Sequence, residues 1–169
     1  MKIFFGAAIQ GKVNRNDRSE IYKAFLETIK EAGHQLISEH ATACSFEENV
    51  MLMEKTMGPL PPVGIERTKY VRNKIIEFIE GPIDAAIFEV STPSLGTGIE
   101  IAHAYLRPRM GLKAIPILTL YEKDYWPGKL SSMIKGLTPA VVNNFYEREF
   151  SNIKEGQGHI LEFLRVINS

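Results

Sequence analysis

Apolar and polar positions follow two alternating patterns along the chain. Short, mostly apolar runs typical of buried strands occur at residues 3–9, 34–38, 84–90, 113–121 and 140–146. Elsewhere the apolar residues recur at helical spacing, most clearly from Ser19 to Ala32, where positions 21, 22, 25, 26, 29 and 32 form one stripe. We expect helices over residues 19–32, 46–57, 66–80, 97–106, 130–135 and 151–167.

The alternation of strands and helices predicts an α/β fold with a doubly wound, Rossmann-like, five-stranded parallel sheet covered by helices on both faces. Gly33 stands where the first helix needs a C-terminal cap, and Gly81-Pro82 ends the helix before the third strand. The chain has 169 residues, and its sequence contains no repeat, linker or low-complexity segment. We therefore expect one domain over residues 1–169.

Composition and charge exclude several classes of function. Lys and Arg together number 20, as do Asp and Glu, so no basic field exists to attract nucleic acid. The apolar runs are too short to span a membrane and no signal peptide is visible, so we expect a soluble, cytoplasmic protein. Cys44 is the only cysteine and the four histidines are scattered, which predicts no disulfide, no metal site and no cofactor.

The segment from Ser91 to Glu100 carries the clearest chemical signal. It joins the carboxyl end of a predicted buried strand to a predicted helix, which is where open α/β sheets bind ligands. Backbone N–H groups at the helix start suit a phosphate, and Ser94 adds a hydroxyl donor. Glu100 lies about one turn into the helix, so its carboxylate can point back over the same crevice. A phosphate cradle beside a carboxylate fits chemistry on a sugar phosphate.

Four segments together resemble one family. Residues 4–11, Glu39-His40, residues 88–100 and residues 131–136 are similar in order and spacing to the 2'-deoxynucleoside 5'-monophosphate N-hydrolases. These belong to the nucleoside 2-deoxyribosyltransferase superfamily. The resemblance extends from residue 3 to about residue 146, and its most specific part is Glu89 to Glu100. It implies an N-glycosidase that converts a (deoxy)nucleoside 5'-monophosphate to free base and (deoxy)ribose 5-phosphate.

The resemblance also implies roles for individual residues. Glu100 matches the nucleophile that attacks the anomeric carbon, forming a glycosyl ester that water then hydrolyses. Ser94, with the amides near Gly96 and Gly98, matches the cradle of the 5'-phosphate. Ser131 matches a serine that reaches the phosphate from a neighbouring subunit, which implies a homodimer. Further residues expected at the substrate are Phe4, Ala7, Ala8, Ile9, Gln10, Gly11 and His40.

The sequence departs from the family at three places. Phe4 replaces a tyrosine whose hydroxyl would orient the nucleophile. Asn73-Lys74 stands where the family has an aspartate that helps the leaving base accept its proton. The segment 41–64 is roughly ten residues longer than the family norm, and either a dimer contact or a lid would explain it.

Three alternative functions stay open, and the departures at Phe4 and Asn73 motivate the last of them. One is base exchange, as in the deoxyribosyltransferases, although a phosphate cradle argues against unphosphorylated nucleosides. A second is a phosphoribohydrolase of the cytokinin-activating type, whose glycine-rich motif is only partly matched by Gly96-Thr97 and Glu100. The third is a catalytically decayed nucleotide-binding protein.

Overall fold

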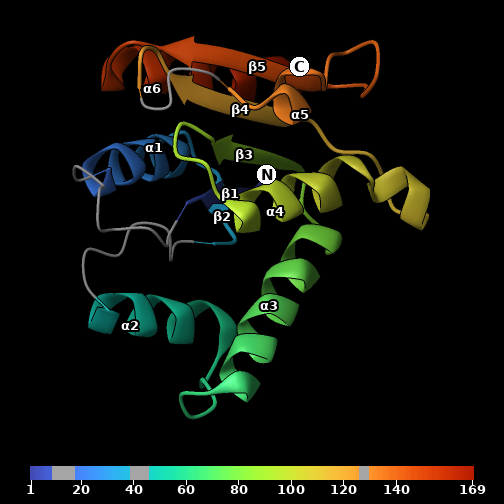
Figure 1. Cartoon of the computed structure of the whole chain (residues 1–169). Coiled ribbons are helices and arrows are strands. Elements are labelled where there is room, and N and C mark those ends of the chain that lie inside the picture. The colour runs from blue at the N-terminus through green and yellow to red at the C-terminus, as the bar shows by residue number, and fades with distance from the viewer. Residues whose placement is uncertain (9–17, 39–45, 126–129) are drawn as a thin grey trace.

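The chain folds around one parallel sheet in which all five strands run in the same direction. The computed structural model describes residues 1–8, 18–38, 46–125 and 130–169, except for the side chain of Phe46. The strands are β1 (Lys2–Ala7), β2 (Gln35–Leu36), β3 (Ala85–Glu89), β4 (Ile117–Glu122) and β5 (Phe145–Phe150). Their order in the sheet is β2-β1-β3-β4-β5, as Figure 1 shows. The predicted α/β doubly wound fold is confirmed.

The helices lie close to their predicted positions. They are α1 (Ser19–Glu31), α2 (Phe46–Met57), α3 (Ile65–Glu80), α4 (Leu95–Tyr105), α5 (Ser132–Lys135) and α6 (Ile153–Ile167). Gly33 has φ +80° and donates its amide to the Lys30 carbonyl after α1. Its predicted role at the end of that helix is thereby confirmed. Helices long and apolar enough to cross a membrane are absent from the described part of the chain.

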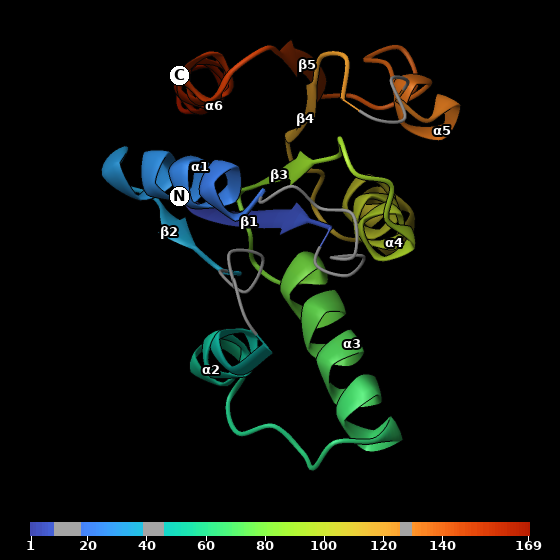
Figure 2. The same ribbon diagram turned by 60° about the vertical axis from the view of Figure 1, so that its left-hand side comes forward.

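Each face of the sheet has its own apolar core, because side chains alternate along the strands. Ile3, Phe5 and Ala7 of β1 point toward α1 and α6 and join one buried cluster. Phe4 points to the other face, where Ile79 of α3 and Ile101 of α4 complete the second cluster. Figure 2 shows α1 and α6 on one side of the strands and α3 and α4 on the other. The sheet is therefore covered on both faces, as predicted.

The boundaries of three strands differ clearly from the prediction, and β2 covers only Gln35–Leu36 of the expected 34–38. The expected fifth strand, 140–146, is wrong over most of its length: residues 140–144 form turns, and Val141 is exposed. Asn144 has φ +64°, a left-handed conformation that asparagine tolerates and that ends the turn. β5 carries charged residues because it is an edge strand that pairs only with β4. β4 starts at Ile117 rather than Lys113.

Two features lie outside the sheet layers. A 3-10 helix that the sequence pattern did not predict follows α4 at Arg107–Met110 and ends at Gly111, which has φ +75°. α2 and the first turns of α3 project away from the sheet in both views (Figures 1 and 2). Two contacts tie them together: Tyr70 Oη donates to the Met57 carbonyl at 2.6 Å, and Arg67 Nε donates to the Pro61 carbonyl at 2.6 Å.

Candidate functional site

The candidate site lies where the strand order of the sheet reverses. The chain passes from β1 to β2 on one side and returns to β3 on the other, so β1 and β3 are neighbours. A doubly wound sheet binds ligands in the crevice at the carboxyl ends of such a strand pair. Gly6 and Ala7 of β1 lie opposite Phe88 and Glu89 of β3. In Figure 2, α4 lies beside the ends of both strands.

Glu100 extends from α4 toward this strand pair. A Cβ atom added to Gly6 would lie 2.7 Å from Glu100 Oε2 and 2.6 Å from Cδ1 of Phe88. Only glycine at position 6 therefore leaves room for the carboxylate against β1. Burial against this mostly apolar wall raises the pKa of the Glu100 carboxyl to about 7. The resulting site holds a carboxylate that can change its charge near neutral pH.

Ser94 begins α4 and organises its first turn. Its Oγ accepts a hydrogen bond from the Thr97 amide at 3.2 Å, which makes Ser94 the N-cap. Because the Ser94 oxygen acts as the acceptor in this bond, the proton of the Ser94 hydroxyl stays available to a ligand. The space beside the helix is open: a Cβ atom at Gly96 would meet only Ser94 Oγ, at 3.7 Å, and one at Gly98 would meet nothing within 4 Å. These glycines leave the backbone of the first turn accessible.

Several buried oxygens around this turn have no hydrogen-bond partner among the described residues. On the side of α4 they are Thr92 Oγ1, Thr97 Oγ1 and Glu100 Oε2. Buried polar groups are normally paired, so three unpaired ones within nine residues of sequence favour a site that receives polar ligand groups. This observation is independent of the helix N-terminus and points to the same crevice.

The other predicted site residues occupy different environments. Phe4 is buried in the core under α3 and α4, where its ring centroid lies 5.8 Å from that of Phe88. Ala7 packs on the opposite face, toward α1 and α6, and Ala8 is fully buried. The predictions for Ile9, Gln10, Gly11 and His40 fall outside the described residues.

Ser131 is separate from this group within the chain. It is the N-cap of α5 and accepts a hydrogen bond from the Met133 amide at 3.3 Å. Over the described residues, no hydrogen bond joins Ser131 to the segment from Ser94 to Glu100. Its expected contribution across a subunit interface stays a prediction.

Asn73, which replaces the family's aspartate, is exposed on α3. Its Oδ1 accepts a hydrogen bond from the neighbouring Arg72 at 3.1 Å. A carboxamide has no proton to transfer at neutral pH. This position therefore offers no general acid to a leaving base.

A buried ionic cluster at the carboxyl ends of β3 and β4 was missed by the sequence reasoning. Arg18, directly before α1, forms ion pairs with Glu89 and Glu122. Burial raises the pKa of the Glu89 carboxyl, while Arg18 and hydrogen bonds from Ser91 lower it again. One signal was available: Glu89 is a charged residue inside an apolar strand, which requires a partner. Nothing in the pattern around Arg18 identified it as that partner.

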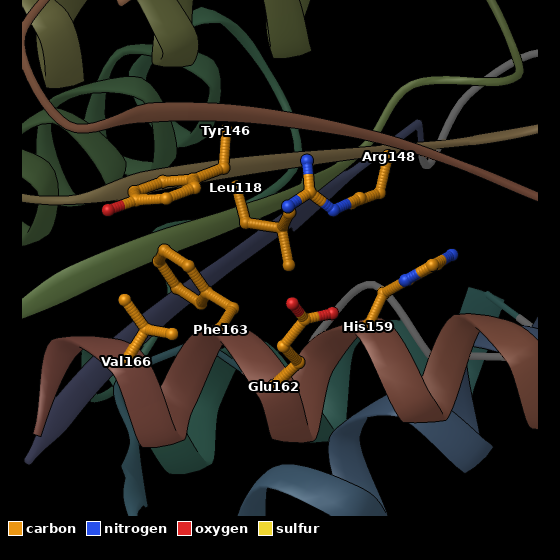
Figure 3. A pocket seen from close by; sticks show the side chains of 7 residues that line it. All are labelled: Leu118, Tyr146, Arg148, His159, Glu162, Phe163 and Val166. Carbon is orange, nitrogen blue, oxygen red and sulfur yellow. The ribbon is translucent and has the colours of Figure 1, made fainter.

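Two hollows in the described part of the structure lie away from Glu100. The one between β5 and α6, shown in Figure 3, has a volume of about 20 Å³, enough for a water molecule only. A wider hollow at Met1, Gly33 and Pro82 lies at the amino ends of the strands, away from the crevice. Among the described residues, no three His, Cys, Asp or Glu side chains gather as metal ligands.

The fold and the candidate site define an α/β protein with a serine-capped helix N-terminus and a largely buried carboxylate at the switch point of its sheet. Comparison with known proteins then identifies two relatives. The chain is 29% identical to a Thermofilum pendens protein named "Putative 2'-deoxynucleoside 5'-phosphate N-hydrolase 1", over 92% of this chain and 89% of that protein. A Methanosarcina barkeri protein of the same name is 29% identical over 80% of this chain and 69% of its own.

These two relatives confirm the resemblance to the 2'-deoxynucleoside 5'-monophosphate N-hydrolases that the segment from Glu89 to Glu100 indicated. No protein-family model matches the sequence.

Proposed function

We propose that this protein is an N-glycosidase that hydrolyses a (deoxy)nucleoside 5'-monophosphate. The observation that carries the proposal is the Glu100 carboxylate in the second turn of α4, which lies against Gly6 of β1 in the same helix that Ser94 caps. The names of both relatives support the same class of reaction. The substrate's 5'-phosphate would lie at the helix N-terminus, held by the Ser94 hydroxyl and by backbone amides near Gly96 and Gly98.

The proposed mechanism has two displacements at the anomeric carbon. In the first, the Glu100 carboxylate attacks C1', the N-glycosidic bond breaks and the base leaves with the bond's electron pair. In the second, water attacks the same carbon, releasing (deoxy)ribose 5-phosphate and regenerating the carboxylate. The crevice favours this course because a carboxylate with few hydrogen-bond partners is a stronger nucleophile than a solvated one.

The departing base must gain a proton, and one departure from the family bears on this step: Asn73 has no acidic proton. The absence of a hydroxyl at the buried Phe4 bears instead on how the nucleophile is oriented. General acid catalysis typically contributes about 10²- to 10⁴-fold to a rate. We therefore expect slower turnover than in a relative that keeps the aspartate.

The proposed active enzyme is a cytoplasmic homodimer built from single-domain chains. In this arrangement Ser131 at the start of α5 would reach the phosphate bound to the other subunit. Its exposure at a helix N-terminus, with an available hydroxyl proton, is consistent with that role.

The decisive experiment measures base release from a panel of ribo- and deoxyribonucleoside 5'-monophosphates by chromatography. We expect release by the wild-type protein and none by Glu100→Ala, whose circular dichroism should match the wild type. A fully active Glu100→Ala variant would contradict the mechanism. Thermal stabilisation by nucleotides without base release would favour the decayed binding protein. Formation of a new nucleoside in the presence of a second free base would indicate a transferase.

A further inference from the structure

The Arg18 guanidinium connects three segments that meet below the candidate site. Arg18 is 3% exposed and precedes α1. It pairs with Glu89 at the end of β3 and with Glu122 at the end of β4, the latter at 2.5 Å. The Tyr125 ring covers it, with the guanidinium carbon 4.3 Å from the ring centroid. A buried charge with this many partners holds its neighbours in one arrangement.

The connection continues from Glu89 into the turn that precedes α4. Glu89 Oε1, the same oxygen that Arg18 binds, accepts hydrogen bonds from the Ser91 hydroxyl and from the Ser91 amide, the latter at 3.2 Å. Ser91 Oγ accepts in turn from the Glu122 amide at 2.7 Å. These hydrogen bonds hold Ser91 in place and so restrict the conformation of the backbone between Ser91 and Ser94.

The ionic cluster and the nucleophile lie on opposite faces of the sheet. Glu89 shares a face of β3 with Ala85 and Ile87, which pack in the cluster under α1 and α6. Glu100 comes from α4 on the other face, against Phe88. Arg18 is therefore separated from Glu100 by the sheet, and among the described residues the hydrogen bonds through Glu89 and Ser91 connect it to the turn that precedes α4.

We propose that Arg18 is a positioning residue that, through Glu89 and Ser91, holds the first turn of α4 in the geometry that receives the substrate's phosphate. This inference rests on the proposed function and assigns a part of the phosphate specificity to a residue that does not touch the substrate. It predicts that damage to the cluster weakens recognition of the phosphate more than recognition of the nucleoside.

The test uses two variants in the cluster. Arg18→Lys keeps the charge but cannot bridge two carboxylates with a planar fork. Ser91→Ala removes the hydroxyl link and leaves the ion pair in place. We expect each variant to lower the preference for a nucleoside 5'-monophosphate over its unphosphorylated nucleoside, measured as a ratio of kcat/KM values. A fall of about tenfold corresponds to the loss of one charge-assisted hydrogen bond. The fall should appear mainly in KM for the phosphorylated substrate.

Arg107→Lys is the matched control. Arg107 is 4% exposed and binds the carbonyls of Ile79, Gly81 and Lys113 at the opposite end of β3. Its substitution should lower the melting temperature without changing the ratio. The proposal is overturned if Arg107→Lys changes the ratio as much as Arg18→Lys does. It is also overturned if the cluster variants lower kcat/KM equally for both substrates.

A binding measurement separates this inference from the proposed function. Titration with ribose 5-phosphate, followed through the amide signals of Gly96 and Gly98, reports on the cradle without any turnover. Weaker binding in Arg18→Lys and Ser91→Ala, with normal binding in Arg107→Lys, would support the inference even if no base is released. Wild-type signals unaffected by ribose 5-phosphate, or equal affinity in all four proteins, would overturn it.

Discussion

At the scale of single residues, the position of Glu100 is the feature with the most chemical consequence. Its carboxylate lies against β1 where only Gly6 leaves space, and burial there raises its pKa to about 7. Ionisation of Glu100 therefore lowers the stability of the folded protein. Such perturbed carboxyl groups are found more often at functional sites than in structural packing.

This cost predicts how stability depends on pH. The unfolded-state pKa is near 4.5 and the folded-state pKa near 7, so between these values the folded protein binds more protons. The free energy of unfolding contributed by Glu100 is then highest below pH 4.5, falls up to pH 7 and is constant above it. Removal of the charge in Glu100→Gln should raise the free energy of unfolding by about 3 kcal/mol at pH 8 and by little at pH 5.

Thermal unfolding of the wild type and of Glu100→Gln at pH 5 and pH 8 measures this difference in the free energy of unfolding. The exposed carboxylate of Glu27 on α1 supplies the control, because Glu27→Gln should leave the melting temperature unchanged at either pH. An equal gain for Glu100→Gln at pH 5 and pH 8 would show that packing, not charge, causes it. The proposed mechanism requires an ionised Glu100, so it predicts that wild-type activity falls as pH decreases below 7.

At the scale of elements, Ser94 has two separable tasks. Its oxygen caps α4, and its proton is available to an anion. Aspartate and asparagine both cap helices as well as serine, but aspartate places a negative charge where a phosphate would bind. The two substitutions therefore distinguish a structural cap from a phosphate ligand.

We predict that Ser94→Asp and Ser94→Asn unfold within about 1 kcal/mol of the wild type, because each retains the cap. Ser94→Asp should raise KM for a nucleoside 5'-monophosphate far more than Ser94→Asn does. Calorimetric unfolding and steady-state kinetics on the three proteins supply the comparison. Equal KM values for the two variants would show that the substrate's phosphate does not bind at this helix N-terminus.

How far the sequence predicted each element depends on where the element's stability comes from. The predicted bounds of α1 agree with the structure because its apolar stripe and Gly33 act locally. The predicted bounds of β5 do not agree, because an edge strand with polar positions is defined by its pairing with β4, and no local sequence pattern contains that pairing. The same reason applies at the site: the turn at residues 91–100 was predicted, whereas Arg18 is brought to Glu89 by tertiary packing across 71 positions.

At the scale of the whole molecule, the order of the strands creates the site and limits what one chain supplies. β1 and β3 bring Gly6 and Phe88 together, and α4 adds Glu100 above them. Ser131 comes from α5, for which the described residues give no hydrogen bond to this group. In the homodimer proposed above, a full site needs a second copy of the chain.

Subunit complementation tests this directly. Ser131→Ala and Glu100→Ala should each have low activity as pure proteins. In a mixed dimer, the Glu100 of one subunit would meet the Ser131 of the other, so one site would be complete. Random exchange of equal amounts should then restore about a quarter of the wild-type activity. If Ser131 acted within its own chain, the same dimer would contain no complete site, and mixing would restore nothing.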